Sequence, residues 1–393
     1  MIEKPRLIEH DNVTKETLGN KNAKILDINS KTGLYPLYVA YSIFCNKCSV
    51  YTGDELDLEL QEKLWKETIT QNIYIICKTP MAKSITKRTL TGYKEIPINA
   101  HCFDDLINMM KNKSDNFVKK ILSSKFWKKE GEQMKFDAIV GNPPYQENIS
   151  KGEGNKSLSK QLFPLFIQNS ILLNSKYISL ITPSRWFTAD AQDKSFIKLR
   201  TFVKEHNHFV KIFNYPDNKL LFKNVEIAGG VNYFLYDRKY IGDVEFIENY
   251  FESNNIASRP LFEDDLDIIL PLNQLVDIAN KVRKHNDFTS LTTITSGRDA
   301  FGISGNKSTL NKTTKKDYFN GSVEVRCAYE EIRYIERENI TKNIELVDKW
   351  KVFTSKGNGG AGNLSEDKPV AILGKSFLGK PASTCSDSLI PIG

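Results

Sequence analysis

The segment GNPPY groups an amide, two prolines and a phenol at the end of the apolar run FDAIV (136–140). Pro143 and Pro144 fix φ and remove two backbone donors, and Asn142 is held extended because a proline follows it. The turn therefore presents the Asn142 side-chain oxygen and backbone carbonyls as rigid acceptors beside the Tyr145 ring. A planar, conjugated NH2 group fits such a site, because two acceptors draw its nitrogen toward tetrahedral geometry and free the lone pair. The alternative is an ordinary Asn-Pro turn with a structural role.

A second polar turn occurs earlier, in ILDINSKTGLY (25–35). Asp27 ends an apolar run, and Gly33 precedes a segment typical of a helix. A glycine at such a turn lets the backbone approach a ligand closely, and an acid nearby can bind hydroxyls or an ammonium group. A strand-to-helix turn with one glycine also occurs without any ligand, so this segment alone leaves both interpretations open.

The elements that must position these turns alternate along the first 240 residues. Short apolar runs typical of strands occur at 23–29, 72–80, 95–103, within 136–145, and at 177–184, 209–215 and 229–238, with helical segments such as 34–44, 162–173 and 195–206 between them. This alternation predicts an α/β fold with a parallel, doubly wound sheet. Ligands of such sheets bind beyond the carboxyl ends of the strands, where DINSKTG, GNPPY and ITPSRWF all fall.

The texture of the sequence changes after about residue 240. The remainder is richer in Asn, Ser and Thr, has weak periodicity, and contains the glycine-rich stretch FTSKGNGGAGNL (353–364). We therefore predict two domains, 1–240 and 241–393, and interpret the second as mixed α/β.

Composition and charge exclude several classes of protein. The 393 residues are 40% hydrophobic, and no run approaches the roughly 18 apolar residues that span a bilayer, so we expect a soluble, cytoplasmic protein. The six cysteines are scattered, which suits a reducing compartment, and CNKC (45–48) lacks a second pair, so no metal site is expected. The net charge of +7 permits an anionic partner such as nucleic acid without demanding one.

In chain order, NSKTGLYPLYVAYSIF, FDAIVGNPPYQ, ITPSRWF and GGVNYFL make the chain resemble the amino-group DNA methyltransferases. Within them it resembles the adenine-specific methylase part of type IIG restriction–modification proteins, over most of residues 20–240. The resemblance implies a Rossmann-like S-adenosylmethionine-dependent methyltransferase sheet and a C-terminal target-recognition region. It also implies methyl transfer to the 6-amino group of an adenine flipped out of double-stranded DNA.

The resemblance implies a catalytic set formed by Asn142, Pro143, Pro144, Tyr145 and Phe222. Asn142 and the Pro143 carbonyl would accept the two amino hydrogens of adenine, and Tyr145 would stack on the base. Phe222 would close the other face of the base, although the sequence equally allows Phe222 and Phe234 to be core residues.

The resemblance also implies a cofactor-binding set formed by Asp27, Asn29, Gly33, Tyr35, Asp104 and Asp105. Asp27 and Gly33 would line the methionine part of S-adenosylmethionine, with Tyr35 in an aromatic position of the family. Asp104 would approach the adenine of the cofactor, and Asp105 is the alternative.

Two further segments fall near the predicted catalytic edge. The loop at 146–160 either closes over DNA, with Lys151, Lys156 and Lys160 on phosphates, or is a solvated surface loop. In TPSRWF, Arg185 is a candidate phosphate ligand, whereas Trp186 is more typical of a core residue.

The sequence departs from the family pattern on the cofactor side. Lys31 stands where the family has the first glycine of its loop, and Cys77 where it has an acid for the ribose hydroxyls. The family also has a cofactor-binding segment upstream of the first strand, and only ~25 residues precede that strand here, which favours a fragment of a longer protein.

Two alternatives follow. One is a non-catalytic DNA-binding specificity module with a decayed cofactor site, and the other is a methyltransferase acting on protein glutamine or on RNA, whose acceptors are also planar NH2 groups. The expected partners are double-stranded DNA and a restriction nuclease domain or subunit outside this chain, with no membrane.

Overall fold

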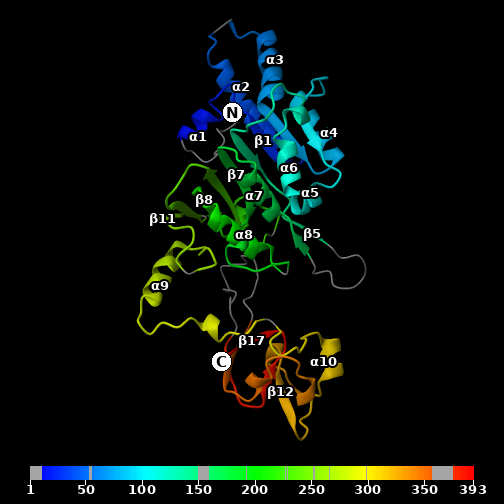
Figure 1. Cartoon of the computed structure of the whole chain (residues 1–393), viewed down its shortest axis with the longest axis vertical. Helices are drawn as coiled ribbons and strands as arrows, with labels where there is room; N and C mark the ends of the chain where they lie inside the picture. Colours follow the sequence, from blue (N-terminus) through cyan, green and yellow to red (C-terminus); the bar gives the residue numbers. More distant parts are fainter. Residues whose placement is uncertain are drawn as a thin grey trace. The chain divides into compact units, whose positions relative to one another are not determined.

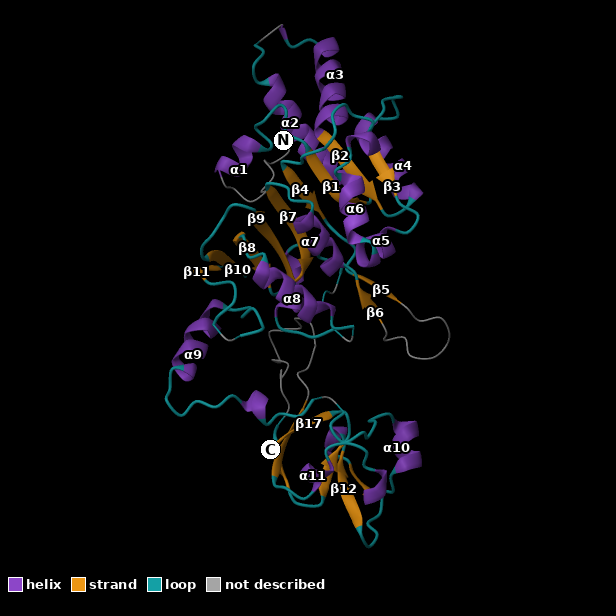
Figure 2. Ribbon diagram, viewed as in Figure 1, coloured by secondary structure: helices purple, strands orange, loops and turns teal. Residues whose placement is uncertain are grey.

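The computed structural model describes residues 11–52, 55–148, 159–191, 193–225, 227, 229–250, 253–264, 266–297, 299–355 and 375–393. The chain divides into two compact units, Met1–Asp277 and Ile278–Gly393. The first unit is a large sheet flanked by helices, as Figure 1 and Figure 2 show. None of the helices in the described ranges combines the length and apolar character that crossing a bilayer requires.

The sheet of the first unit has nine strands in the order β11-β10-β8-β9-β7-β4-β1-β2-β3. The strands are β1 (Ile25–Ser30), β2 (Ile73–Cys77), β3 (Asn99–Cys102), β4 (Ala138–Gly141), β7 (Tyr177–Pro183), β8 (Phe209–Tyr215), β9 (Val231–Asp237), β10 (Val244–Asn249) and β11 (Asn254–Arg259). Five neighbours, from β3 to β7, are parallel. The predicted α/β fold with a mainly parallel sheet is thereby confirmed.

Helices cover both faces of this sheet, because neighbouring residues of each strand point to opposite sides. Ile25 packs with residues of α2 and α4, whereas Leu26 and Ile28 pack with residues of α5 to α8. The helices are α1 (Asp11–Glu16), α2 (Leu34–Cys48), α3 (Leu58–Glu67), α4 (Pro80–Thr91), α5 (Leu106–Asn112), α6 (Ser114–Ile121), α7 (Phe163–Leu172) and α8 (Ser195–Glu205). Strands buried on both faces explain the nearly continuous apolar runs of the sequence.

The expectation of a uniformly parallel sheet is wrong for β9, which is antiparallel to both β7 and β8. Among its described residues, the connection from β8 to β9 contains only the short helix η5 (Asn218–Leu220) and no crossover helix, so the chain returns at the same edge. Gly230 allows this return, because it has φ +78° and a Cβ there would collide with the Tyr215 carbonyl oxygen. The apolar pattern of a strand does not reveal its direction.

The predicted site turns share one edge of the sheet. The strands β1, β4 and β7 are consecutive and parallel, so Ser30, Gly141 and Pro183 end at the same side. We call this side, with the end of β8, the carboxyl edge. The sequence expectation that DINSKTG, GNPPY and ITPSRWF converge is met by this strand order.

The first unit extends beyond the boundary predicted at residue 240. Strand β10 pairs in parallel with β8, and β11 pairs with β10. The buried Arg259 at the end of β11 donates to the Asn273 side chain, which ties the following segment to the sheet. The change in composition after 240 therefore marks edge strands of the same unit.

The second unit contains two three-stranded sheets, of order β13-β12-β16 and β15-β14-β17. Its elements are α10 (Lys307–Thr313), β12 (Ser322–Arg326), β13 (Ile332–Glu336), α11 (Ile344–Val347), β14 (Lys351–Ser355), β15 (Phe377–Gly379), β16 (Ser383–Cys385) and β17 (Leu389–Ile392), and α9 (Asn273–Arg283) spans the division between the units. Its core includes Phe301, Val325 and Phe353. Most of the glycine-rich stretch at 353–364 lies outside the described residues.

Candidate active site

The turn at residues 142–145, called the NPPY turn below, begins directly after β4. The residues of β4 are buried, and Pro143 and Pro144 end the strand because they have no N–H for the ladder. The Tyr145 carbonyl accepts a hydrogen bond from the Leu162 N–H, 3.0 Å away, which fixes the exit of the turn beside the start of α7. Asn142 is half-buried at the carboxyl edge.

The ring of Tyr145 packs against the hydrophobic core of the first unit. The ring meets Phe163 edge-on with 6.5 Å between centroids. Its hydroxyl is buried without a hydrogen-bond partner among the described residues, and burial raises the pKa of this phenol, with Tyr35 adding to the shift. Tyr35, from the predicted cofactor set, thus influences the titration of Tyr145, from the predicted catalytic set.

Asp27 carries a buried carboxylate next to the NPPY turn. The side chain is 2% exposed, and its Oδ1 accepts from the Asn29 N–H at 3.1 Å. Its Oδ2 has no partner among the described residues. Burial raises the pKa of Asp27 to about 7, although the Asn29 N–H, Ser30 and Lys31 all oppose the rise. Gly141 faces this group, since a Cβ there would lie 3.2 Å from Asp27 Oδ1.

Asn29 contacts both sides of the candidate site. Its Nδ2 donates to the carbonyl oxygen of Asn142 at 3.2 Å, while its backbone N–H donates to Asp27. The sequence assigned Asn29 to the cofactor and gave no sign of the contact with the NPPY turn.

The turn after β1 is clamped by α4. Gly33, with φ +81°, begins α2, and a Cβ there would lie 2.9 Å from the Cβ of Thr89. Thr89 Oγ1 donates to the Thr32 carbonyl at 2.6 Å, and Ser30 Oγ lies 3.0 Å from Thr86 Oγ1. Gly33 is therefore required for packing against α4 as well as for the open turn that the sequence predicted.

Lys31 and Tyr35 are exposed side chains near Asp27. Burial lowers the pKa of Lys31, and the Asp27 charge opposes that shift. Tyr35 is 42% exposed, and burial raises its pKa together with the Asp27 charge. Lys31, at the position where the family has a glycine, thus lies close enough to offset part of the negative charge of Asp27.

The two acids after β3 have different surroundings. Asp105 caps α5, because its side chain accepts from the Asn108 N–H at 3.2 Å. Asp104 is exposed and precedes the cap, so of the two alternatives Asp104 has the carboxylate that is open to a ligand. Cys77, at the end of β2, is fully buried, and burial raises the pKa of its thiol to about 12. A neutral, buried thiol is a poor replacement for an acid that binds ribose hydroxyls.

Phe222 lies in the connection between β8 and β9, at the carboxyl edge. It is half-buried and belongs to none of the three hydrophobic clusters, whereas Phe234 is a core residue with 1% exposure. The buried Asn218 holds this connection together, because its carbonyl accepts from the Phe222 N–H at 2.8 Å and its Oδ1 accepts from the Ile227 N–H at 3.1 Å. Sequence reasoning missed Asn218, whose role depends on contacts that only the folded loop makes.

Two further candidates follow β7 at this edge, and of these Trp186 has the burial expected of a core residue. Trp186 is fully buried, and the guanidinium of Arg185 lies 5.8 Å from the centre of the Phe196 ring. Of the loop at 146–160, only its ends are described, as β5 (Gln146–Asn148) and β6 (Ser159–Gln161). The predicted phosphate ligands Lys151 and Lys156 lie outside the described residues.

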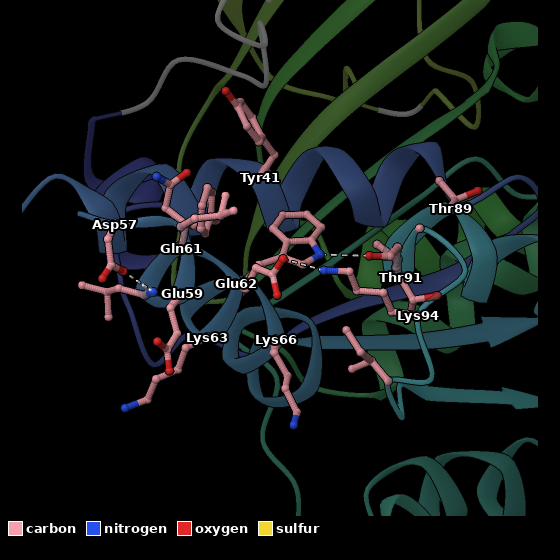
Figure 3. A pocket seen from close by; sticks show the side chains of 17 residues that line it. Tyr41, Asp57, Glu59, Gln61, Glu62, Lys63, Lys66, Thr89, Thr91 and Lys94 are labelled. Carbon is pink, nitrogen blue, oxygen red and sulfur yellow. Dashed lines mark hydrogen bonds and ion pairs between the residues drawn. The ribbon is translucent and has the colours of Figure 1, made fainter.

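A separate groove of about 1070 Å³ lies on α2, α3 and the end of α4 (Figure 3). Trp65 forms part of its wall and donates to the Leu90 carbonyl at 2.9 Å, and Lys94 pairs with Glu62 at 2.7 Å. The groove contains none of the predicted site residues. The candidate active site therefore rests on the carboxyl edge.

The comparison with protein families agrees with the geometry. The pattern of the family described as Eco57I restriction-modification methylase matches residues 71–222, from just before β2 to Phe222. This match confirms the predicted resemblance to the adenine-specific methylases of restriction–modification systems. An "Uncharacterized adenine-specific methylase" of Mycoplasma pneumoniae is 37% identical over 110 residues, which are 28% of this chain and 25% of that protein.

The comparison with solved structures gives matches to larger restriction–modification enzymes. A nuclease-deletion mutant of the Type ISP enzyme LlaGI, in complex with a DNA substrate mimic, has a TM-score of 0.52 at 11% identity, over 97% of this chain and 40% of that chain. The Type IIL enzyme MmeI in complex with DNA has a TM-score of 0.48 at 11% identity, over 97% and 59%. The LlaGI comparison shows a shared fold, and this chain spans less than half of that protein.

Proposed function

We propose that this chain is a site-specific DNA adenine methyltransferase that uses S-adenosylmethionine and acts within a restriction–modification system. The observation that carries the proposal is the NPPY turn at the end of β4, next to the carboxylate oxygen of Asp27 on β1 that has no partner among the described residues. A set of acceptors for an amino group thus lies beside a site that favours a cation or hydroxyl group. The family match and the methylase relative support this reading.

The NPPY turn would act by preorganised hydrogen bonding. The Asn142 side-chain oxygen and the Pro143 carbonyl accept the two hydrogens of the 6-amino group, which draws the nitrogen out of conjugation. Tyr145 offers a ring face to the base, and Phe222 closes the other face. The nitrogen becomes acidic once it is alkylated, so its proton leaves without a strong base in the turn.

The residues around Asp27 fit S-adenosylmethionine, which when bound supplies an electrophilic methyl group. Asp27 Oδ2 is buried and unpartnered among the described residues, and it would accept from a polar group of the cofactor. Gly33 and Gly141 keep side chains away from the space beside Asp27 and the turn. Tyr35, in the first turn of α2, and Asp104, which follows β3, would hold the cofactor at the carboxyl edge.

The second unit would recognise the DNA target. It has a polar groove of about 560 Å³ that includes Lys312, Lys315, Tyr334 and Asn339. Cationic side chains bind phosphates, and amide side chains form hydrogen bonds with base edges. Flipping the target adenine costs a few kcal/mol, which contacts to the backbone and the two stacking rings would offset.

A methylation assay tests the proposal. Unmethylated bacterial duplex DNA is incubated with the cofactor and with wild type or Asn142→Ala, and N6-methyladenine is quantified by mass spectrometry. We expect wild-type transfer and a loss of at least ~10²-fold in the variant, the usual effect of removing one preorganised hydrogen-bonding group. Parallel reactions with RNA and with glutamine-containing protein distinguish the other acceptors. If wild type methylates no adenine at any cofactor concentration, the proposal fails.

The burial of Cys77 favours a second candidate, a DNA-binding specificity module without catalysis. A neutral thiol replaces the expected ribose-binding acid, and Lys31 adds a charge of the same sign as the cofactor. Isothermal calorimetry that detects DNA binding but no binding of S-adenosylmethionine would favour this candidate over the enzyme.

A further inference from the structure

The contacts of Asn29 connect two segments that lie 113 residues apart. Its side-chain amide donates to the Asn142 carbonyl at 3.2 Å, and its backbone N–H donates to Asp27 Oδ1 at 3.1 Å. The pairing of Asp27 with Val140 brings these two segments side by side on β1 and β4. At 4% exposure, Asn29 makes both contacts away from water.

The carbonyl that Asn29 holds belongs to the peptide between Asn142 and Pro143. This peptide joins the two residues that carry the acceptors of the NPPY turn. Its plane, together with the ring-fixed φ of Pro143, determines where the backbone of Pro143 begins relative to Asn142. One hydrogen bond from Asn29 thus restrains the backbone segment on which both acceptors lie.

We propose that Asn29 is a positioning residue that orients the NPPY turn and joins it to the carboxylate of Asp27. The inference rests on the proposed function, because it assigns the work of Asn29 to the amino-group acceptors rather than to the cofactor. Displacing a reacting group by about 1 Å costs on the order of 10²-fold in rate, so a brace at this peptide has a measurable effect.

Two substitutions distinguish a brace from a cofactor ligand. Asn29→Ala removes the donor, whereas Asn29→Asp keeps the shape but presents carboxylate oxygens to the Asn142 carbonyl. If Asn29 orients the NPPY turn, Asn29→Asp should lower the rate more than Asn29→Ala does, because the new carboxylate oxygen and the Asn142 carbonyl oxygen repel each other. A ligand of the cationic cofactor predicts the opposite, since an added carboxylate would tighten cofactor binding.

The chain offers a matched control in Asn72. It is 1% exposed, and its Nδ2 donates to the Ala23 carbonyl at 2.7 Å, before the start of β1. Asn72→Ala therefore removes a buried amide-to-carbonyl bond near the other end of β1. It also removes the bond from Asn72 to the Lys21 carbonyl and the bond from Lys47 Nζ to Asn72 Oδ1, so it is the harsher test of general stability. A general loss of stability would appear in both alanine variants.

The experiment uses the full chain and three measurements. Hydrogen exchange by mass spectrometry follows peptides covering residues 141–148, calorimetry without DNA follows binding of S-adenosylmethionine, and single-turnover assays follow methyl transfer. We expect Asn29→Ala to raise exchange in that segment and to lower the transfer rate ~10- to 100-fold, with cofactor affinity changed less than ~3-fold. Asn29→Asp should lose more rate, and Asn72→Ala should leave the exchange of this segment unchanged.

Several outcomes would overturn the assignment. Equal exchange of residues 141–148 in Asn29→Ala and Asn72→Ala would show that Asn29 does not brace the turn. Tighter binding of the cofactor by Asn29→Asp would make Asn29 a cofactor ligand. A wild-type chain without methyl transfer would refute the proposed function, while hydrogen exchange would still decide whether Asn29 holds the turn.

Discussion

At the scale of single residues, the buried carboxylate of Asp27 makes the stability of the free protein depend on pH. Burial raises its pKa from 3.8 to about 7, so between these values the folded chain holds a proton that the unfolded chain releases. This contribution to stability is fully present below pH 3.8 and is lost as the pH rises through about 7. In the cofactor-free protein, the buried ionised carboxylate of Asp27 therefore lowers the free energy of unfolding.

Replacing Asp27 by asparagine removes this dependence. We expect Asp27→Asn to raise the free energy of unfolding at pH 8 by on the order of 2–4 kcal/mol, and to change it far less at pH 4. Urea unfolding of the cofactor-free protein across this pH range measures the effect. Asp104→Asn is the control, since Asp104 is exposed. Parallel pH profiles for wild type and Asp27→Asn would contradict the shift.

Residue types whose chemistry is local were predictable from the sequence. The prolines and the amide of GNPPY define a rigid set of acceptors without knowledge of any partner, and Gly33 is found where the turn needs positive φ. The contacts of Asn29 and Asn218 were not predictable, because each depends on partners that only the folded backbone places. Asp27 was found as a ligand candidate, but its unpartnered oxygen is a property of the packed site.

At the scale of elements, the strand order explains why the predicted turns meet. Each apolar run was recognisable as a strand, yet its neighbours and direction depend on the connections between strands. The return from β8 to β9 without a crossover helix makes β9 antiparallel and places Phe222 at the carboxyl edge. The two glycines of GGVNYFL allow the chain to return from β8 to β9. From the sequence alone, we interpreted them only as part of a strand.

Gly230 should be the residue on which this return depends. Gly230→Ala meets left-handed strain and a collision with the Tyr215 carbonyl oxygen, whereas Gly131, with φ +90°, has open space around a Cβ. We expect Gly131→Ala to destabilise by ~1–2 kcal/mol from strain alone, and Gly230→Ala by ~2–5 kcal/mol from strain and overpacking. Chemical denaturation of both variants measures the difference. Equal losses would mean that the close approach at Gly230 carries no cost.

At the scale of the whole molecule, the predicted site residues are unevenly distributed between the two units. The first unit contains every predicted catalytic and cofactor residue, and the sheet continues through β11. The composition does change near residue 240, but the two compact units divide after Asp277. The edge strand β11 alternates exposed and half-buried residues, so its sequence resembles that of the second unit more closely than the sequences of the central strands do.

If the second unit reads DNA, removing cations from its groove should weaken binding without disturbing the first unit. Lys312 and Lys315 are exposed in that groove, and no ion pair holds either among the described residues. Each phosphate contact contributes about one unit to the slope of log affinity against log salt. We expect Lys312→Ala with Lys315→Ala to reduce that slope by about 2 and to leave binding of S-adenosylhomocysteine unchanged.

Lys342 provides the control for this pair, because it lies in the same unit and is paired with Asp299 at 2.6 Å. Neutralising it removes a charge of the same sign from the unit without emptying the groove, so a general electrostatic effect would appear in Lys342→Ala as well. Fluorescence anisotropy of labelled duplex DNA at four salt concentrations measures the slopes. An unchanged slope in the double variant would assign phosphate binding to other residues. A change in Lys342→Ala half as large as in the double variant would mean that each removed charge has the same effect wherever it lies, and would contradict a specific role for the groove.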